Sequence, residues 1–167
     1  MKLKDLNAAL SEFRKALSIR ENVLGKNHPE TGASHEHIGA VLLEKGDDDV
    51  ALTSFRKALN IVRESANQKG RLIDRLHNNI GELHFKKGNY TGALECYREA
   101  LKNVEAVKGK GHPDTAACYD KIGSVLQAKG DLDEALEEFQ KALEIRESVS
   151  ENGDVAPFNR DDDDSYE

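Results

Sequence analysis

Apolar residues recur at helical spacing along most of the chain, and the pattern itself returns every 42 residues. The stretch ALSEFRKAL, which begins at Ala9, is followed by related stretches that begin at Ala51, Ala93 and Ala135. Within each copy the apolar positions i, i+4, i+7 and i+8 form a stripe on one face of a helix. A fixed period of this length is typical of a solenoid, in which each unit buries its apolar face against its neighbours.

A second helical pattern precedes this stretch in each period, for example Leu76, Ile80 and Leu83 in the middle copy. Between the two patterns stands Lys-Gly-Asp or Lys-Gly-Asn, in which Gly suits the end of one helix and Asp or Asn the N-cap of the next. The loop is therefore short, and the two helices should be antiparallel neighbours. The sequence predicts seven helices, at about residues 5–24, 31–45, 48–66, 72–87, 90–107, 114–129 and 132–149.

Glycines stand in the middle of the first helix of each pair, again 42 residues apart, at Gly39, Gly81 and Gly123. Each costs about 1 kcal/mol relative to Ala, so we expect the second helix to approach too closely for a side chain. The small alanines of the second helix, such as Ala93, should supply the matching surface. One aromatic residue in each second helix is then expected to fill the gap to the next repeat: Phe13, Phe55, Tyr97 and Phe139.

These landmarks resemble the tetratricopeptide repeat, a 34-residue helix pair with Gly, Ala, aromatic and Ala at set positions. The eight extra residues lengthen the second helix and add a Gly-Lys-x-His-Pro connection, present at His28-Pro29 and His112-Pro113 but absent from 66–71. This variant is similar to the repeats of kinesin light chains. The resemblance covers residues 5–149 and implies an all-α, right-handed superhelix of about three and a half repeats. The expected units are a half repeat at 5–24 and repeats at about 31–66, 72–107 and 114–149.

The resemblance also implies a binding groove, because the first helices of such repeats line the concave face. The repeat register places these residues in the groove: Glu36, His37, Arg75, Asn78, Asn79, Glu82, Phe85, Lys86, Asp120, Lys121 and Gln127. Asn79 matches an asparagine with which related repeats hold the backbone of an extended peptide. Arg75 and Lys86 would then be available for carboxylates of the partner. A merely solvated helix face is the alternative.

Charge is distributed unevenly, since residues 151–167 hold seven of the acids and one base of a chain whose net charge is −7. The body is therefore nearly neutral, which argues against non-specific nucleic-acid binding. Segment 150–167 is predicted to be a disordered acidic tail. No apolar stretch approaches the length of a membrane span. Cys96 and Cys118 are expected to be small buried residues in a reducing compartment, and a cytoplasmic location is expected.

Catalytic and metal-binding patterns are not evident in the sequence. His28 and His112 belong to the His-Pro connections, and His35, His77 and His84 occupy positions where such repeats place aromatic rings. His77 and His84 share a helix face, but two histidines without nearby acids or thiolates make a poor metal site. We therefore expect no metal and no cofactor. The phosphate-loop spacing is absent from the Gly-Lys segments. We therefore expect no enzymatic activity.

The sequence favours a protein–protein interaction scaffold that binds a partner peptide in the concave groove, with the partner's identity left open. Two alternatives remain: an interaction or sensor segment of a larger multidomain protein, and a self-associating structural unit. The second alternative is based on apolar residues at the two ends of the array, which are expected to be exposed: Leu6, Leu10 and Leu17 at the start, and Leu143 and Val149 at the finish.

Overall fold

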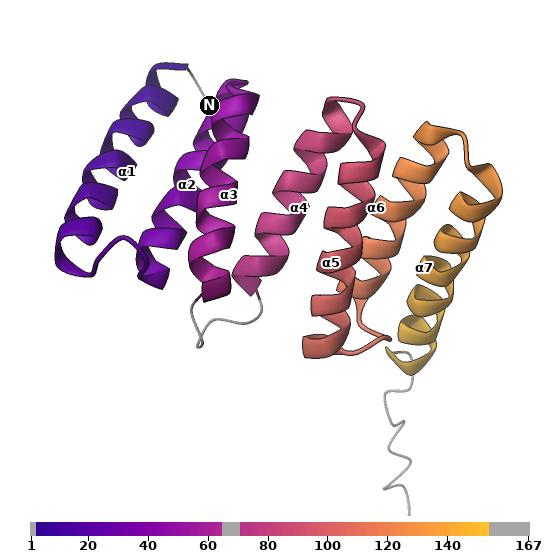
Figure 1. Cartoon of the computed structure of the whole chain (residues 1–167). Coiled ribbons are helices and arrows are strands. Elements are labelled where there is room, and N and C mark those ends of the chain that lie inside the picture. The colour runs from indigo at the N-terminus through magenta and orange to yellow at the C-terminus, as the bar shows by residue number, and fades with distance from the viewer. Residues whose placement is uncertain (1–2, 65–70, 154–167) are drawn as a thin grey trace, which may run out of the picture.

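The computed structural model describes residues 3–64 and 71–153, within which all regular structure is α-helical. The helices are α1 (Leu3–Val23), α2 (Pro29–Lys45), α3 (Asp48–Glu64), α4 (Arg71–Lys86), α5 (Tyr90–Lys108), α6 (Pro113–Lys129) and α7 (Leu132–Gly153). They stand side by side in a row of antiparallel neighbours from α1 to α7 (Figure 1). The expected disordered tail lies outside the described residues except for 150–153, which continue α7 as helix.

Each repeat is held together by an aromatic ring that packs on a mid-helix glycine. A Cβ atom added to Gly39 would lie 2.7 Å from the Phe55 ring, and one added to Gly81 would lie 2.7 Å from the Tyr97 ring. Phe139 stands in the same relation to Gly123. The sequence did not identify this contact within the repeat. The expected contact with the next repeat is also present, because the Lys121 ammonium of α6 lies 5.5 Å from the centre of the Tyr97 ring, and the Phe13 ring lies 5.2 Å from that of His37 in α2.

The core is continuous across neighbouring repeats. One cluster of buried apolar side chains joins α1, α2, α3 and α4, and a second joins α5, α6 and α7. Leu6 and Leu10 belong to the first cluster and are each only 5% exposed, so the prediction that they form an exposed apolar end was wrong. Leu17 is partly buried against the same cluster. These leucines pack against the following helix pair rather than facing away from the array.

The other end of the array does expose apolar residues. Leu136 and Leu143 of α7 are 57% and 53% exposed, and Val149 is exposed as well. Their counterparts one repeat earlier, Leu94 and Leu101, are buried or partly buried against the core of α5, α6 and α7. Within the described residues, α6 covers the outer stripe of α5, whereas no helix covers the same stripe of α7.

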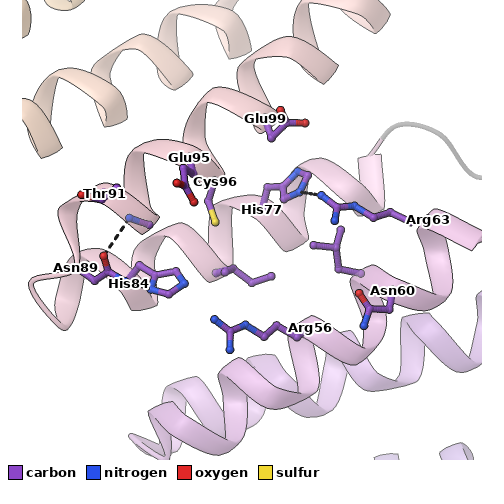
Figure 2. A pocket seen from close by; sticks show the side chains of 13 residues that line it. Arg56, Asn60, Arg63, His77, His84, Asn89, Thr91, Glu95, Cys96 and Glu99 are labelled. Atoms are coloured by element: carbon purple, nitrogen blue, oxygen red, sulfur yellow. Dashed lines mark hydrogen bonds between the residues drawn. The ribbon is translucent and has the colours of Figure 1, made fainter.

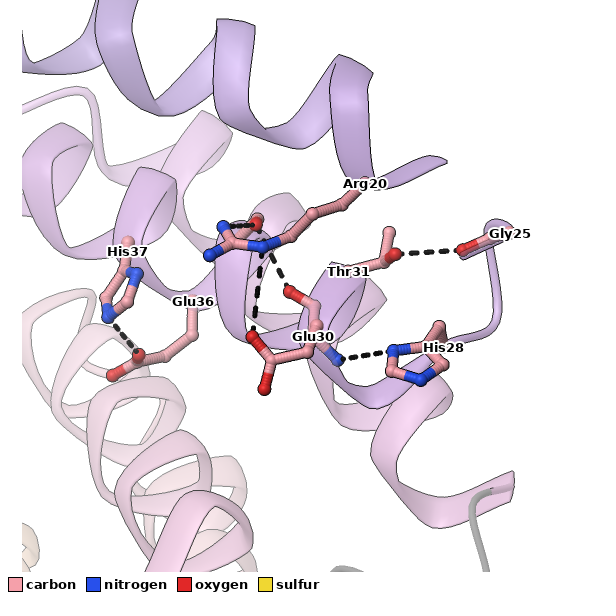
Figure 3. Close-up of polar contacts among 8 residues, drawn as sticks. Arg20, Gly25, His28, Glu30, Thr31, Glu36 and His37 are labelled. Atoms are coloured by element: carbon pink, nitrogen blue, oxygen red, sulfur yellow. Dashed lines mark hydrogen bonds and ion pairs between the residues drawn. The ribbon is translucent and has the colours of Figure 1, made fainter. Parts of the chain in front are cut away.

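The His-Pro connections are capped helix starts, which sequence reasoning did not identify. Nδ1 of His28 accepts a hydrogen bond from the backbone N–H of Glu30 at 3.2 Å, while Thr31 donates to the carbonyl oxygen of Gly25 at 2.8 Å (Figure 3). His112 and Thr115 repeat both bonds at the start of α6. The imidazole thus takes the role that Ser or Asp usually has at an N-cap, and Pro occupies the first helical turn.

His77 is a buried member of the helix packing, as its place in the repeat predicted. It is 3% exposed, and its Nε2 lies 3.1 Å from the Arg63 guanidinium. Because a guanidinium can only donate, Nε2 must be the acceptor and the proton must reside on Nδ1. Burial and then the charge of Arg63 lower the pKa of His77, against an opposing effect of Glu99. The imidazole is therefore neutral in the folded protein at neutral pH.

We predict that Gly81→Leu destabilises the fold by about 1–3 kcal/mol, because the added side chain overlaps the Tyr97 ring. Urea denaturation followed by circular dichroism measures the change. The sequence alone placed Ala93 opposite Gly81, whereas the structure identifies Tyr97 as the contact. Gly111→Leu is the matched control, because a Cβ atom there meets nothing within 4 Å. An unchanged midpoint in Gly81→Leu would contradict the ring-on-glycine contact.

We also predict that the free energy of unfolding falls as pH drops from about 7.5 to 5.5. Burial lowers the pKa of His35, His77 and His84 below 6.5, so the unfolded chain takes up these protons before the folded chain does. Acidification through this range therefore favours unfolding. His77→Gln keeps an acceptor for Arg63 but removes one titrating group, and should lose less stability over the same range. Identical pH profiles for the two proteins would show that His77 is not held neutral.

Candidate functional site

All the residues that the sequence placed in a groove lie on the first helices α2, α4 and α6. We use the name A-helix face for the side chains of α2, α4 and α6 at these positions. Positions 42 residues apart, such as His37, Asn79 and Lys121, repeat along it from helix to helix. Direct side-chain bonds join α2 to α4 and α4 to α6, so the three helices form one surface.

Between α2 and α4 the bond is an ion pair. Nη2 of Arg75 donates to Oε2 of Glu36 at 3.0 Å, and His37 lies 3.6 Å from the same oxygen (Figure 3 shows Glu36 and His37). Glu36 is only 6% exposed, whereas the Arg75 side chain is largely exposed. Arg75 therefore neutralises a buried carboxylate of the neighbouring repeat. Removing it would leave that buried carboxylate with only His37 nearby, at a cost in stability.

Between α4 and α6 the bond is centred on Asn78. Its Oδ1 accepts from the Lys121 ammonium at 2.8 Å, and its Nδ2 donates to the carbonyl oxygen of Asp74 at 2.9 Å. The same ammonium lies 5.5 Å from the centre of the Tyr97 ring, a cation–π contact. Asn78 and Lys121 thus connect adjacent repeats, and the amide of Asn78 already has partners on both sides.

Three further residues of the predicted groove contact other side chains of the array. Asp120 accepts hydrogen bonds from Arg146 of α7, and Lys86 forms a 2.7 Å ion pair with Asp48 of α3. Phe85 lies 6.0 Å from Tyr90 between ring centres and packs against the core of the last three helices. These side chains stabilise the array, which leaves less of the predicted set available to a partner.

Asn79, Glu82 and Gln127 remain. Among the described residues, none of these three side chains has a hydrogen-bond or ion-pair partner. Asn79 lies next to Asn78 near the middle of α4, and its amide can donate and accept at the same time. It is therefore the residue of the face best suited to pair with a peptide backbone.

A hollow of about 420 Å³ opens beside Asn78, between α4 and α6. Three residues that the sequence placed in the groove, Arg75, Asn78 and Lys121, line it. Asp74 and Cys118, which sequence reasoning did not assign to the site, line it as well. Burial raises the pKa of the Asp74 carboxyl and raises that of the Cys118 thiol to about 11. The Oδ1 atom of Asp74 is buried without a hydrogen-bond partner. The wall of the hollow thus contains a carboxyl group with a buried, unpartnered oxygen and a thiol that burial keeps protonated.

No three His, Cys, Asp or Glu side chains of residues 3–64 and 71–153 lie close enough together to hold a metal ion. None of the seven described helices is both long enough and apolar enough to cross a membrane.

Solved structures show the same fold. BtubC (BKLC) from P. vanneervenii matches with a TM-score of 0.79 and 16% sequence identity over 98% of this chain. A Podosopora anserina protein of nearly identical TPR-like repeats, which carries a kinesin light chain name, matches with a TM-score of 0.71 and 16% identity. A variant of that protein gives 0.73 and the same identity. The two cover 86% and 87% of this chain, respectively.

The chain spans 63% of the length of BtubC, and 68% and 69% of the Podosopora anserina protein and its variant. A comparison with curated proteins found no match. At these identities the structural similarity establishes the fold alone.

A family model for the tetratricopeptide repeat matches residues 1–64 and 72–148, which is most of the sequence. The unmatched gap includes the connection that lacks the His-Pro motif. Proteins built from this repeat are typically non-enzymatic scaffolds for protein–protein interaction. The 42-residue period, the ring-on-glycine packing and the family match together show that this chain belongs to the tetratricopeptide repeat family.

Proposed function

We propose that the protein is a non-enzymatic adaptor that binds an extended segment of a partner protein along the A-helix face. The observation that supports this proposal is the amide of Asn79, which has no hydrogen-bond partner among the described residues and lies on α4, the helix whose Asn78 lines the hollow between α4 and α6. An extended peptide exposes backbone N–H and C=O groups, and a side-chain amide can accept a hydrogen bond from the first and donate one to the second. The hollow is large enough for a side chain of the same peptide.

The ion pairs of the face modify the chemistry expected of the partner. Arg75 already serves Glu36, and Lys121 already serves Asn78, so neither is a free cation. Glu82 adds a negative charge that has no ion-pair partner among the described residues. Recognition should therefore depend more on backbone hydrogen bonds and on the side chain in the hollow than on acidity of the partner.

We further propose a cytoplasmic location. Cys96 and Cys118 are both free, and burial is the main cause that raises the pKa of each thiol. Two unpaired thiols within helices are consistent with a reducing compartment.

Self-association is a second candidate function, favoured by the exposed stripe of α7. The leucines that this stripe presents are covered by another helix at the same place in the preceding repeat. A second copy that packs on this stripe would cover Leu136 and Leu143. The stripe of α7 replaces the N-terminal leucines as the predicted surface of self-association, because Leu6 and Leu10 are buried.

For the adaptor, we predict that Asn79→Ala weakens peptide binding about five- to a hundredfold, since two neutral hydrogen bonds contribute about 1–3 kcal/mol. The probe is a peptide selected on the intact chain from a displayed library of random 12-residue sequences, and fluorescence anisotropy measures its Kd. Asn22→Ala, the same change on the exposed surface of α1, should leave the Kd unchanged. Equal effects of the two substitutions would contradict binding on the A-helix face.

For self-association, we predict a concentration-dependent mass in multi-angle light scattering that disappears in the variant Leu136→Lys/Leu143→Lys. Both leucines are exposed, so these changes should not unfold the chain. Lys102→Leu, which adds rather than removes an exposed apolar side chain on α5, is expected to keep the association. A wild-type mass that stays at that of one chain up to high concentration would exclude this second function.

A further inference from the structure

A cleft of about 670 Å³ lies between the second helices α3 and α5, above α4 (Figure 2). Its floor contains Leu59 and Ile80, which are buried, and the neutral imidazole of His77. The residues of this cleft are separate from those of the A-helix face, so a ligand bound in the cleft does not depend on the proposed adaptor site.

The two walls of this cleft carry opposite charges. Arg56 and Arg63 project from α3, and Glu95 and Glu99 project from α5 (Figure 2). Among the described residues, neither glutamate forms an ion pair or hydrogen bond, and the one side-chain bond of the arginines is that of Arg63 to His77. The open space between the walls thus separates two rows of charge that do not neutralise each other directly.

Two pairs of opposite charges follow one another along the cleft, Arg63 with Glu99 and Arg56 with Glu95. Arg63 and Glu99 both act on His77, where they shift its pKa in opposite directions. Arg56 and Glu95 act in the same opposed way on His84, nearer the start of α5. A row of two cations therefore runs along one wall while a row of two anions runs along the other.

The repeat does not require the placement of Arg63 opposite Glu99, although Arg56 recurs as Arg14 and Arg98 and Glu95 recurs as Glu137. The positions equivalent to Arg63 in the other repeats hold acids, namely Glu21, Glu105 and Glu147. The positions equivalent to Glu99 hold bases, namely Lys15, Lys57 and Lys141. Both charges are thus reversed together in this one cleft. The other repeats fold with the opposite charges at these two positions, so packing does not fix the charges of Arg63 and Glu99. These charges are free to serve recognition.

We propose that this cleft binds an extended segment of a partner protein in which acidic and basic residues alternate. Successive side chains of an extended strand point to opposite sides, and those on the same side are about 7 Å apart. Glu95 and Glu99 are four residues apart on α5, which is about 6 Å, and Arg56 and Arg63 are seven residues apart on α3, which is about 10 Å. Each wall can therefore meet the side chains on one side of the extended segment. The acids of the segment face Arg56 and Arg63, and its bases face Glu95 and Glu99.

Segments of a single charge do not fit these walls. A purely acidic segment places every second side chain against Glu95 or Glu99, and a purely basic one places every second side chain against the arginines. Exposed ion pairs are individually weak and are screened by salt, so the complex should be strongest at low ionic strength. The order of charges, rather than their sum, determines the fit.

The test uses the full chain and two fluorescein-labelled, end-blocked peptides of identical composition. One is Glu-Lys repeated four times, and the other has four Glu followed by four Lys. At about 20 mM salt, anisotropy should show the alternating peptide binding at least about tenfold more tightly than the block peptide. Equal affinity for the two peptides, or no binding of the alternating peptide, would overturn the proposal.

Exchanging the charges of the two walls tests whether the alternating peptide binds in this cleft. Arg56→Glu/Arg63→Glu should weaken binding of the alternating peptide at least about tenfold, and adding Glu95→Lys/Glu99→Lys should restore it, because the peptide can shift by one residue in the exchanged cleft. The control Lys57→Glu/Lys102→Glu makes the same change of net charge on α3 and α5 outside the cleft, and should leave the affinity nearly unchanged. Failure of the fourfold variant to recover binding while it remains folded would overturn the proposal.

Loss of the Arg63–His77 contact could itself unfold the chain, which a thermal melt would reveal. In that case Arg56→Glu weakens binding, and Arg56→Glu/Glu95→Lys restores it, with Arg63 left in place. An affinity that is insensitive to Arg56→Glu would contradict the proposed orientation of the peptide.

Discussion

The packing of an aromatic ring on a glycine within each helix pair is the contact on which the other features of the array depend. Because Gly39, Gly81 and Gly123 have no side chain, the rings of Phe55, Tyr97 and Phe139 can lie against the first helix. The helix pair is thereby fixed as a unit, and the same contact recurs with the 42-residue period. Side chains 42 residues apart consequently occupy equivalent places, which aligns residues from three repeats into continuous surfaces.

The polar contacts between first helices then determine how much of the A-helix face is left for a partner. A buried carboxylate at Glu36 requires a cation, and Arg75 provides it from the next repeat. The amide of Asn78 is satisfied by Lys121 in the same way. These contacts hold successive repeats in register and also withdraw charges from the face. What remains for recognition is the amide of Asn79 on α4 and the hollow that Asn78 and Lys121 line between α4 and α6.

The sequence predicted the helices closely because each boundary has a local cause. Glycine ends, Asn caps and the first-turn prolines act over a few residues, so they can be identified without tertiary information. The partner of each ring was not predictable in the same way. Periodicity shows that Tyr97 is buried but not which helix it meets, and Gly81 could be matched equally well with Ala93. The exposure of Leu6 was mispredicted for the same reason, since the stripe of a helix does not reveal which neighbour covers it.

The functional residues were the hardest to predict because α4 contributes to two surfaces at once. Asn78 and Asn79 belong to the A-helix face, while His77 and His84 belong to the cleft between α3 and α5. Adjacent residues of a helix are about 100° apart around its axis, so neighbours in sequence can serve opposite sides. Whether a polar residue of α4 holds the array together or meets a partner depends on side chains up to 43 positions away, as the bond from Lys121 to Asn78 shows. That dependence is also what makes the two surfaces separable: Asn78 and Arg56 lie on different helices and line different cavities, so substitution of one leaves the walls of the other in place.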